Sequence, residues 1–222
     1  MKYGDYRDWK LIDYMPATGD MVPECLVQYI KGNERVLDVG SHHGDAARFL
    51  AERGLQVLGI DINSDAVKYA CDHTYSDLLN RNLRFQVADL FDDAILSQKY
   101  EIVLLNRFLT CMPKYENWKR ALKGVSDMLC NGGIIYINDF LLMPDYVQNR
   151  NRYMSALRDG LRWGNLVVNA DQGKPWFIAH HHSEKDLEVI TKPYLPLLYR
   201  RYATSSRSGY LSSMFEFAGR KP

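Results

Sequence analysis

The stretch RVLDVGSHHGDAARFL contains residues that could bind a ligand at a tight turn. A short apolar run is followed by a turn with Gly40 and Gly44 at its ends, and a helical pattern begins directly afterwards. Two neighbouring histidines, His42 and His43, occupy the turn itself. A strand that passes through a glycine turn into a helix is how many nucleotide-binding folds begin. The first question is therefore which ligand this turn would bind.

The turn lacks the features of a phosphate-binding loop. A dinucleotide fingerprint, GxGxxG, counted from Gly40 would need glycines at positions 42 and 45, where the chain has His42 and Asp45. A carboxylate in the first helical turn disfavours a phosphate, because helix N-termini attract anions. A GxxxxGK[ST] loop is absent from the sequence. We therefore expect a ligand that is not held through phosphates, and a nicotinamide-dependent dehydrogenase remains only an enzyme alternative.

The elements that would position this turn alternate between strands and helices. Short runs rich in β-branched residues predict strands at 35–39, 56–61, 83–89, 100–108 and 134–142. Helical patterns lie between the strands, at 45–54, from Asn63 to about residue 80 and near Ile95. A fourth helix is predicted from an apolar stripe formed by Trp118, Leu122, Val125 and Leu129, and the sequence NGG (131–133) would end it. Strands buried on both faces and separated by helices predict a parallel, doubly wound sheet with its ligand site at the carboxyl ends of the strands.

The last third of the chain follows a different pattern. A helix is predicted over 149–161, and Ser183 with Asp186 three residues later predicts a capping box at the start of another helix. Two further strands, 197–203 and 211–218, are joined by the polar turn SSRSG. These two strands are expected to pair as an antiparallel hairpin.

These residues resemble the class I S-adenosylmethionine-dependent methyltransferases. That family's first motif, acidic-x-Gly-x-Gly-x-Gly, is present as DVGSHHG, with Asp38 at its start and His42 in place of the second glycine. Acidic residues end the next two strands of the family, as Asp61 and Asp89 do here. The resemblance covers residues 35–140 and the final hairpin. It implies an α/β fold with a doubly wound, seven-stranded, mostly parallel sheet and a C-terminal antiparallel hairpin strand.

The resemblance also implies a cofactor, S-adenosyl-L-methionine, which leaves as S-adenosyl-L-homocysteine. Asp61 would accept hydrogen bonds from the two ribose hydroxyls, and Asp89 would lie near the adenine amino group. The loop after the fourth strand would contact the methionine end through Asn106. The full set of implied cofactor-binding residues is Asp38, Gly40, His42, Gly44, Asp61, Ile62, Ala88, Asp89, Leu90 and Asn106.

The domain organisation follows from the same resemblance. Residues 1–222 would form a single methyltransferase domain. Residues 1–34, with aromatic side chains at Tyr3, Tyr6, Trp9 and Tyr14, would form an N-terminal helical lid over the cofactor. Residues 143–182, which are rich in arginine and tryptophan, would cover the substrate.

A second histidine cluster, His180, His181 and His182, precedes the last helix. A neutral imidazole here could remove a proton from a hydroxyl or amine acceptor, and His181 is the predicted catalytic base. His180 and His182 could share one face of an extended segment, but no carboxylate spacing completes a metal site. Asn138 and Asp139 are reversed relative to the metal-binding pair of catechol-type methyltransferases, so a metal-independent enzyme is expected.

Composition narrows the substrate classes. A net charge of +1 provides no electrostatic attraction to nucleic acid or anionic lipid. The four scattered cysteines, and the absence of a signal-like or membrane-spanning run, indicate a cytoplasmic protein with free thiols. We therefore predict methyl transfer to an oxygen or nitrogen atom of a small molecule. The alternatives are a nucleic-acid methyltransferase and a non-catalytic S-adenosylmethionine-binding protein, and a homodimer stays open.

Overall fold

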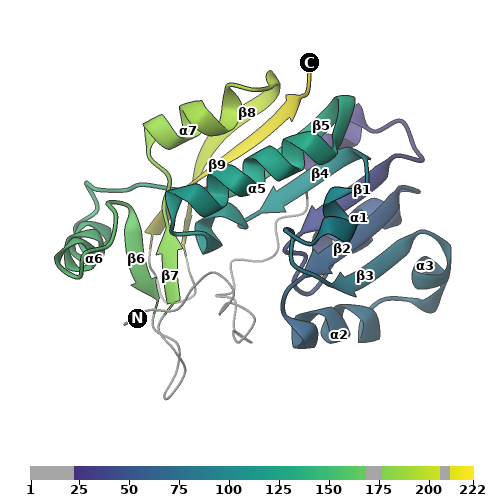
Figure 1. The fold of residues 1–222 in the computed structure, drawn as a ribbon, viewed down its shortest axis with the longest axis horizontal. Helices are drawn as coiled ribbons and strands as arrows, with labels where there is room; N and C mark the ends of the chain where they lie inside the picture. The colour runs from purple at the N-terminus through teal and green to yellow at the C-terminus, as the bar shows by residue number, and fades with distance from the viewer. Residues whose placement is uncertain (1–22, 169–176, 206–210) are drawn as a thin grey trace.

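A computed structural model describes residues 23–168, 177–205 and 211–222 (Figure 1). The predicted aromatic lid residues at positions 3, 6, 9 and 14, together with Trp176 and most of the turn SSRSG, lie outside the described residues. Among the described residues, no helix combines the length and the apolar composition needed to cross a bilayer.

The core of the fold is a seven-stranded sheet in the order β3-β2-β1-β4-β5-β9-β8. Its first five members are parallel, whereas β9 runs antiparallel to both β5 and β8. This arrangement confirms the predicted doubly wound sheet with a C-terminal antiparallel hairpin. The strands are β1 (Arg35–Val39), β2 (Gln56–Asp61), β3 (Leu83–Val87), β4 (Tyr100–Asn106), β5 (Leu129–Leu141), β8 (Leu195–Ser205) and β9 (Leu211–Arg220).

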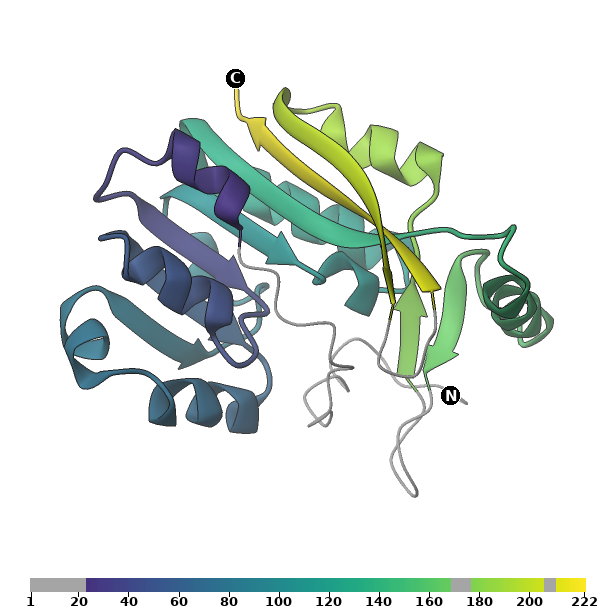
Figure 2. The same cartoon turned by 180° about the vertical axis from the view of Figure 1, so that it is seen from behind.

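Helices cover both faces of this sheet (Figures 1 and 2). Apolar residues of α5 and α7 pack with one face, and those of α1, α3 and the 3-10 helix η2 pack with the other, giving two separate apolar clusters. The helices are η2 (Glu24–Tyr29), α1 (Asp45–Ala51), α2 (Ser64–Asp72), α3 (Ser76–Arg81), α4 (Asp93–Leu96), η3 (Leu109–Cys111), α5 (Tyr115–Met128), α6 (Val147–Arg158) and α7 (Glu184–Thr191).

The burial of the strands follows their place in the sheet. The central strands β1 and β4 are buried along almost their whole length, as their unbroken apolar runs predict. The prediction of burial on both faces is wrong for β3, which is the edge strand and is mostly exposed. Strand β3 also ends at Val87 rather than at Asp89.

Two predicted helix boundaries are wrong. The single helix expected from Asn63 to about residue 80 is broken between α2 and α3, where the hydroxyl of Thr74 donates to the carbonyl of Ala70 and Tyr75 is extended. Helix α5 ends at Met128 because Leu129 is already extended and begins β5. The sequence NGG therefore lies inside the strand, at an irregularity in its pairing with β4.

Among the described residues between positions 143 and 182, one helix and two short strands pack together beside the sheet. Helix α6 packs against a two-stranded antiparallel sheet of β6 (Asn165–Val168) and β7 (Phe177–His180), which the sequence did not indicate. Tyr153 of α6 is fully buried against Leu166 and Ala179. At the other end of the chain, η2 lies on the hairpin face, where the Tyr29 hydroxyl donates to the carbonyl of Leu197.

Candidate active site

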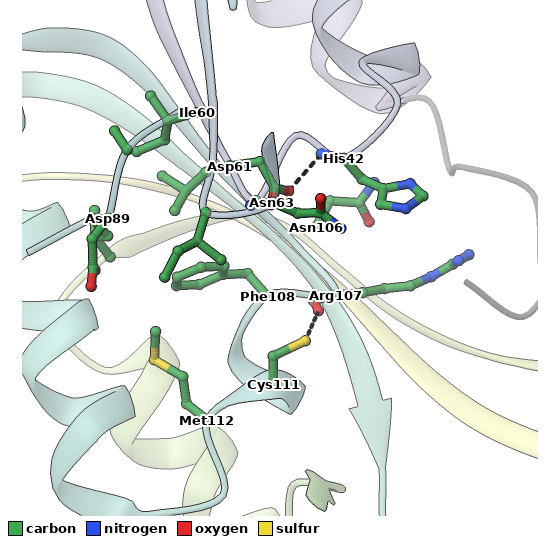
Figure 3. A pocket seen from close by; sticks show the side chains of 15 residues that line it. His42, Ile60, Asp61, Asn63, Asp89, Asn106, Arg107, Phe108, Cys111 and Met112 are labelled. Carbon is green, nitrogen blue, oxygen red and sulfur yellow. Dashed lines mark hydrogen bonds between the residues drawn. The ribbon is translucent and has the colours of Figure 1, made fainter. Parts of the chain in front are cut away.

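A pocket opens at the carboxyl edge of the parallel sheet, where β1, β2 and β4 end (Figure 3). It contains about 790 Å³ of unfilled space, part of it open to solvent. Its walls are mostly apolar, with a few polar side chains from neighbouring strand ends. The lining residues are Val39, Gly40, His42, Ile60, Asp61, Ile62, Asn63, Ala88, Asp89, Leu90, Asn106, Arg107, Phe108, Cys111 and Met112.

The glycine turn requires left-handed backbone at alternate positions. Gly40, His42 and Gly44 have φ angles of 70°, 46° and 83°. Glycine adopts such angles without steric cost, whereas histidine does not, which explains why this motif normally has glycine at all three positions. The amides of Gly40 and Ser41 both donate to the carbonyl of Ile60, so the turn is fixed to the end of β2.

Asp61, at the end of β2, is held by the backbone on both of its carboxylate oxygens. The N–H of His42 donates to Oδ2 over 2.9 Å, and the N–H of Asn63 donates to Oδ1 over 2.8 Å. Burial raises the pKa of Asp61, and hydrogen bonds from the backbone of Asn63, His42 and Ile62 oppose that rise. The ionised carboxylate is an acceptor on the pocket wall, so it can accept hydrogen bonds from the hydroxyls of a ligand.

The loop after β3 forms the next part of the wall. The Ala88 amide donates to the carbonyl of Asp61 over 3.0 Å, which fixes this loop to β2. Asp89 is half-buried, and its Oδ1 accepts from the Phe91 amide over 3.1 Å. Its two neighbours in the sequence, Ala88 and Leu90, are buried, so the Asp89 carboxylate is flanked by two apolar residues.

The segment after β4 closes the pocket. The Phe108 ring lies so close to Gly40 that a Cβ there would meet its Cδ2 at 2.9 Å. Arg107 has a φ of 53°, and its amide donates to the Asn138 carbonyl over 2.7 Å. Burial, together with the charges of Asp139 and Asp61, raises the pKa of Cys111 well above its usual value. Cys111 is therefore a neutral wall residue rather than a nucleophile.

The pocket brings together most of the predicted cofactor residues, namely Gly40, His42, Asp61, Ile62, Ala88, Asp89, Leu90 and Asn106. Asp38 and Gly44 do not line it. Asp38 is buried within β1, and Gly44 precedes α1, where an added Cβ would meet the Phe85 ring at 2.5 Å. His43 packs on Tyr69 of α2, with ring centroids 4.1 Å apart.

The structure does not bring His181 to this pocket. Its Nδ1 lies 2.7 Å from the hydroxyl of Tyr153, and its ring stacks on Phe140. Both partners of the hydrogen bond are buried; burial lowers the pKa of His181 well below its usual value and raises the pKa of Tyr153 to about 12. His181 is not among the described residues that line the pocket, so this arrangement does not place it to act directly as a base there.

Several lining residues were not predicted from the sequence. Ile60 and Val39 could have been found, because they directly precede predicted strand-end residues. Cys111 and Met112 could not, because they reach the wall through the short helix η3, for which no periodic signal exists. The sequence also provided no carboxylate near His180 and His182, whereas the structure places Asp186 beside them.

Comparison with known proteins identifies the family. The sequence profile of the methyltransferase domain matches residues 30–218, so this chain belongs to the methyltransferase domain family. The match confirms the family predicted from the strand-end residues and the glycine turn.

Solved structures share the fold over nearly the whole chain. A structure described as an S-adenosylmethionine-dependent methyltransferase from Methanosarcina mazei is 24% identical, covers 91% of this chain and 98% of its own, and has a TM-score of 0.79. Magnesium protoporphyrin IX methyltransferase from Synechocystis, with bound S-adenosylhomocysteine, is 20% identical over 89% of this chain and 78% of its own, with a TM-score of 0.61.

A curated relative is similar over a shorter stretch. An uncharacterized methyltransferase of Schizosaccharomyces pombe is 46% identical over 57 residues, which are 26% of this chain. The match spans 39% of the length of that relative.

Proposed function

We propose that this protein binds S-adenosyl-L-methionine in the strand-end pocket and transfers its methyl group to an oxygen or nitrogen atom of a small molecule. The observation that carries this proposal is the Asp61 carboxylate, which two backbone amides hold in place on the pocket wall. A carboxylate fixed in this way is suited to two neighbouring hydroxyls such as those of a ribose. The family membership of residues 30–218 supports the same reaction class.

The electrostatics of the turn favour this cofactor over one with phosphates. Asp45 stands in the first turn of α1, where it forms an ion pair with Arg48. A negative charge at that helix terminus opposes a pyrophosphate and tolerates a ligand with a positive sulfonium and a zwitterionic tail. Bound in this pocket, S-adenosylmethionine would supply an already activated methyl group.

Different residues would bind different parts of the cofactor. Asp61 would hold the ribose, Asp89 with Ala88 and Leu90 would hold the adenine, and the turn at Gly40 and His42 with Asn106 would face the methionine part. Asp38 and Gly44 would act indirectly, by shaping the turn. These residues position the donor and exclude water from it, which is the main work in an in-line displacement.

The acceptor would bind beside Phe108, Cys111 and Met112, which give the pocket an apolar wall. Residues 143–182 would cover it. A net charge of +1 favours a small-molecule acceptor over nucleic acid. The Synechocystis relative is named for magnesium protoporphyrin IX, which is also a small molecule.

Two measurements test the proposal. Isothermal titration with S-adenosylhomocysteine and with NAD should show binding of the first only. Radiolabelled S-adenosylmethionine should then label a small-molecule metabolite pool and leave RNA and DNA fractions unlabelled. Label in a nucleic-acid fraction would overturn the acceptor assignment, and binding with no labelled product would support a non-catalytic binding protein.

A further inference from the structure

A second cluster of polar side chains is buried beyond the pocket, on the other side of η3. His180 is the last residue of β7, His182 follows two positions later, and Asp186 lies in the first turn of α7. Each is at most 4% exposed. One ligand atom from each lies within 4.8 Å of the other two. Small movements of the three side chains would bring these atoms to the distances at which they coordinate a metal ion.

Hydrogen bonds fix the protonation of the first histidine. Nδ1 of His180 lies 2.7 Å from Oδ1 of Asn165, whose own amide nitrogen donates to the carbonyl of Pro113. The amide oxygen can only accept, so the ring donates from Nδ1 and its Nε2 carries the lone pair. That Nε2 faces Oδ2 of Asp186 at 3.5 Å, which places two electron-pair donors opposite each other. Oδ2 also accepts hydrogen bonds from Ser183, whereas Nε2 has no hydrogen-bond partner among the described residues, so a cation between the two would use the free lone pair of Nε2 and the negative charge of the carboxylate.

His182 is a second, independent indication of a bound cation. The His182 side chain is fully buried, and among the described residues neither of its ring nitrogens has a hydrogen-bond partner. A buried imidazole without hydrogen bonds is unfavourable, because nothing replaces the water that it has lost. Its Nε2 lies 3.8 Å from Oδ2 of Asp139, which is itself held by the amides of Thr110 and Phe140. A carboxylate behind a ligand histidine is the usual outer partner in metal sites.

The backbone holds the three side chains in this arrangement. The His182 amide donates to the Phe140 carbonyl, and its carbonyl accepts from the Leu142 amide, both over 2.9 Å. Residues two apart on an extended segment point to the same side, which brings His180 and His182 together. The capping box with Ser183 holds Asp186 in place, and Arg162 donates to its other oxygen over 2.6 Å.

We propose that His180, His182 and Asp186 form a binding site for one divalent first-row transition-metal ion, with zinc as the best match. Imidazole nitrogens and a carboxylate oxygen are zinc ligands, and a fourth ligand such as a water molecule would complete a tetrahedral set. The site is structural, because its ligands are buried and do not line the pocket. The ion would link β7 to α7. Thr110 of η3 donates a hydrogen bond to the His180 carbonyl and would connect the metal site to the pocket wall.

The experiment uses the full chain after removal of metal with a chelator. Zinc is added, excess is removed by desalting, and bound zinc is measured by mass spectrometry. We expect one zinc ion per chain, and a melting temperature that rises by roughly 5–10 °C at a hundredfold excess of zinc over its Kd. Cobalt(II) in place of zinc should give the visible absorption bands of a four-coordinate site.

Matched variants assign the ligands. His182→Gln and, separately, Asp186→Asn should abolish both the retained zinc and the thermal shift, whereas the control His73→Gln, an exposed histidine on the surface, should keep both. A wild-type chain that retains no zinc and shows no cobalt bands would overturn the proposal. Undiminished zinc in both ligand variants would also overturn it. If neither variant folds, the wild-type stoichiometry and cobalt spectrum decide alone.

Discussion

The main-chain N–H of His42 donates a hydrogen bond to the Asp61 carboxylate over 2.9 Å, and this contact joins the glycine turn to the end of β2. The turn and the carboxylate therefore act as one unit. The left-handed backbone of His42 aims its N–H at Oδ2, while Asn63 binds Oδ1 from the other side. The geometry of the proposed ribose site is thus built into the backbone before any ligand arrives.

Removal of the Asp61 carboxylate should weaken cofactor binding. Two charge-assisted hydrogen bonds to hydroxyls together account for about 3 kcal/mol, so Asp61→Ala should raise the Kd for S-adenosylhomocysteine on the order of 100-fold. Asp61→Asn, which keeps one acceptor oxygen, should have an intermediate effect. Isothermal titration measures both, and the exposed Asp65→Asn on α2 is the matched control. Wild-type affinity in a folded Asp61→Ala protein would refute the ribose assignment.

Cofactor affinity should also depend on pH through Asp61. Burial raises the pKa of this carboxyl above its ordinary value. The ionised form accepts the hydroxyl protons, so affinity is full above the raised pKa and falls as the pH drops through it. The fall should begin at a higher pH than for an unperturbed aspartate, whose pKa is about 3.9. Titrations between neutral pH and about pH 4.5 check this, and Asp61→Asn should lose this component of the pH dependence.

Substitutions at His42 should separate backbone strain from side-chain function. A non-glycine residue in the left-handed region costs about 1–2 kcal/mol, and glycine loses roughly 0.5–1 kcal/mol of chain entropy on folding. His42→Gly should therefore change the free energy of unfolding by no more than about 1 kcal/mol. His42→Val should destabilise the protein by more, because a β-branched side chain is least tolerated at positive φ. Urea unfolding of the two variants provides the comparison, and equal stabilities would contradict the strain argument.

The parts of the site that the sequence predicts correctly are those fixed by local pattern. Asp61 directly follows an apolar run, and parallel strands bring their carboxyl ends to one edge, so its place beside the turn could be deduced from strand order. The same reasoning places Asp89 and Asn106 on the pocket wall. It fails for Gly44, which has the left-handed backbone of the motif but faces Phe85 instead of the pocket.

The parts that the sequence does not predict depend on tertiary packing. The place of His181 is set by α6 and the β6–β7 sheet. The sequence predicts the helix, over 149–161, but the polar, aromatic segment gives no signal for the two strands. Nε2 of His180 and Oδ2 of Asp186 lie 3.5 Å apart although the two residues are separated by six positions, and that spacing does not reveal the contact. Likewise, the early end of α5 depends on the pairing of β5 with β4 rather than on its own residues.

The Tyr153–His181 hydrogen bond should prove to be structural. Tyr153→Phe leaves a buried histidine nitrogen without its partner, so the free energy of unfolding should fall by about 1–3 kcal/mol. The double variant with His181→Phe should recover part of that loss. A general base contributes about 10²–10⁴-fold to rate, so a loss of that size in a folded His181→Gln enzyme would instead establish His181 as the catalytic base.

The ion pair between Arg200 of β8 and Glu216 of β9 should stabilise the C-terminal hairpin through the buried carboxylate. Glu216 is 1% exposed and also accepts hydrogen bonds from the Tyr136 hydroxyl, over 2.7 Å, and from the Cys25 thiol. Arg200→Ala removes its only cationic partner among the described salt bridges. Because the Arg200 side chain is half-exposed, water replaces part of the interaction, and the loss should be about 1–3 kcal/mol. Arg201→Ala, which breaks the exposed pair with Glu184 and an exposed hydrogen bond to the Tyr199 hydroxyl, is the matched control and should cost less than about 1 kcal/mol in the same urea unfolding experiment. Equal losses in the two variants would show that burial of Glu216 adds nothing to the pair.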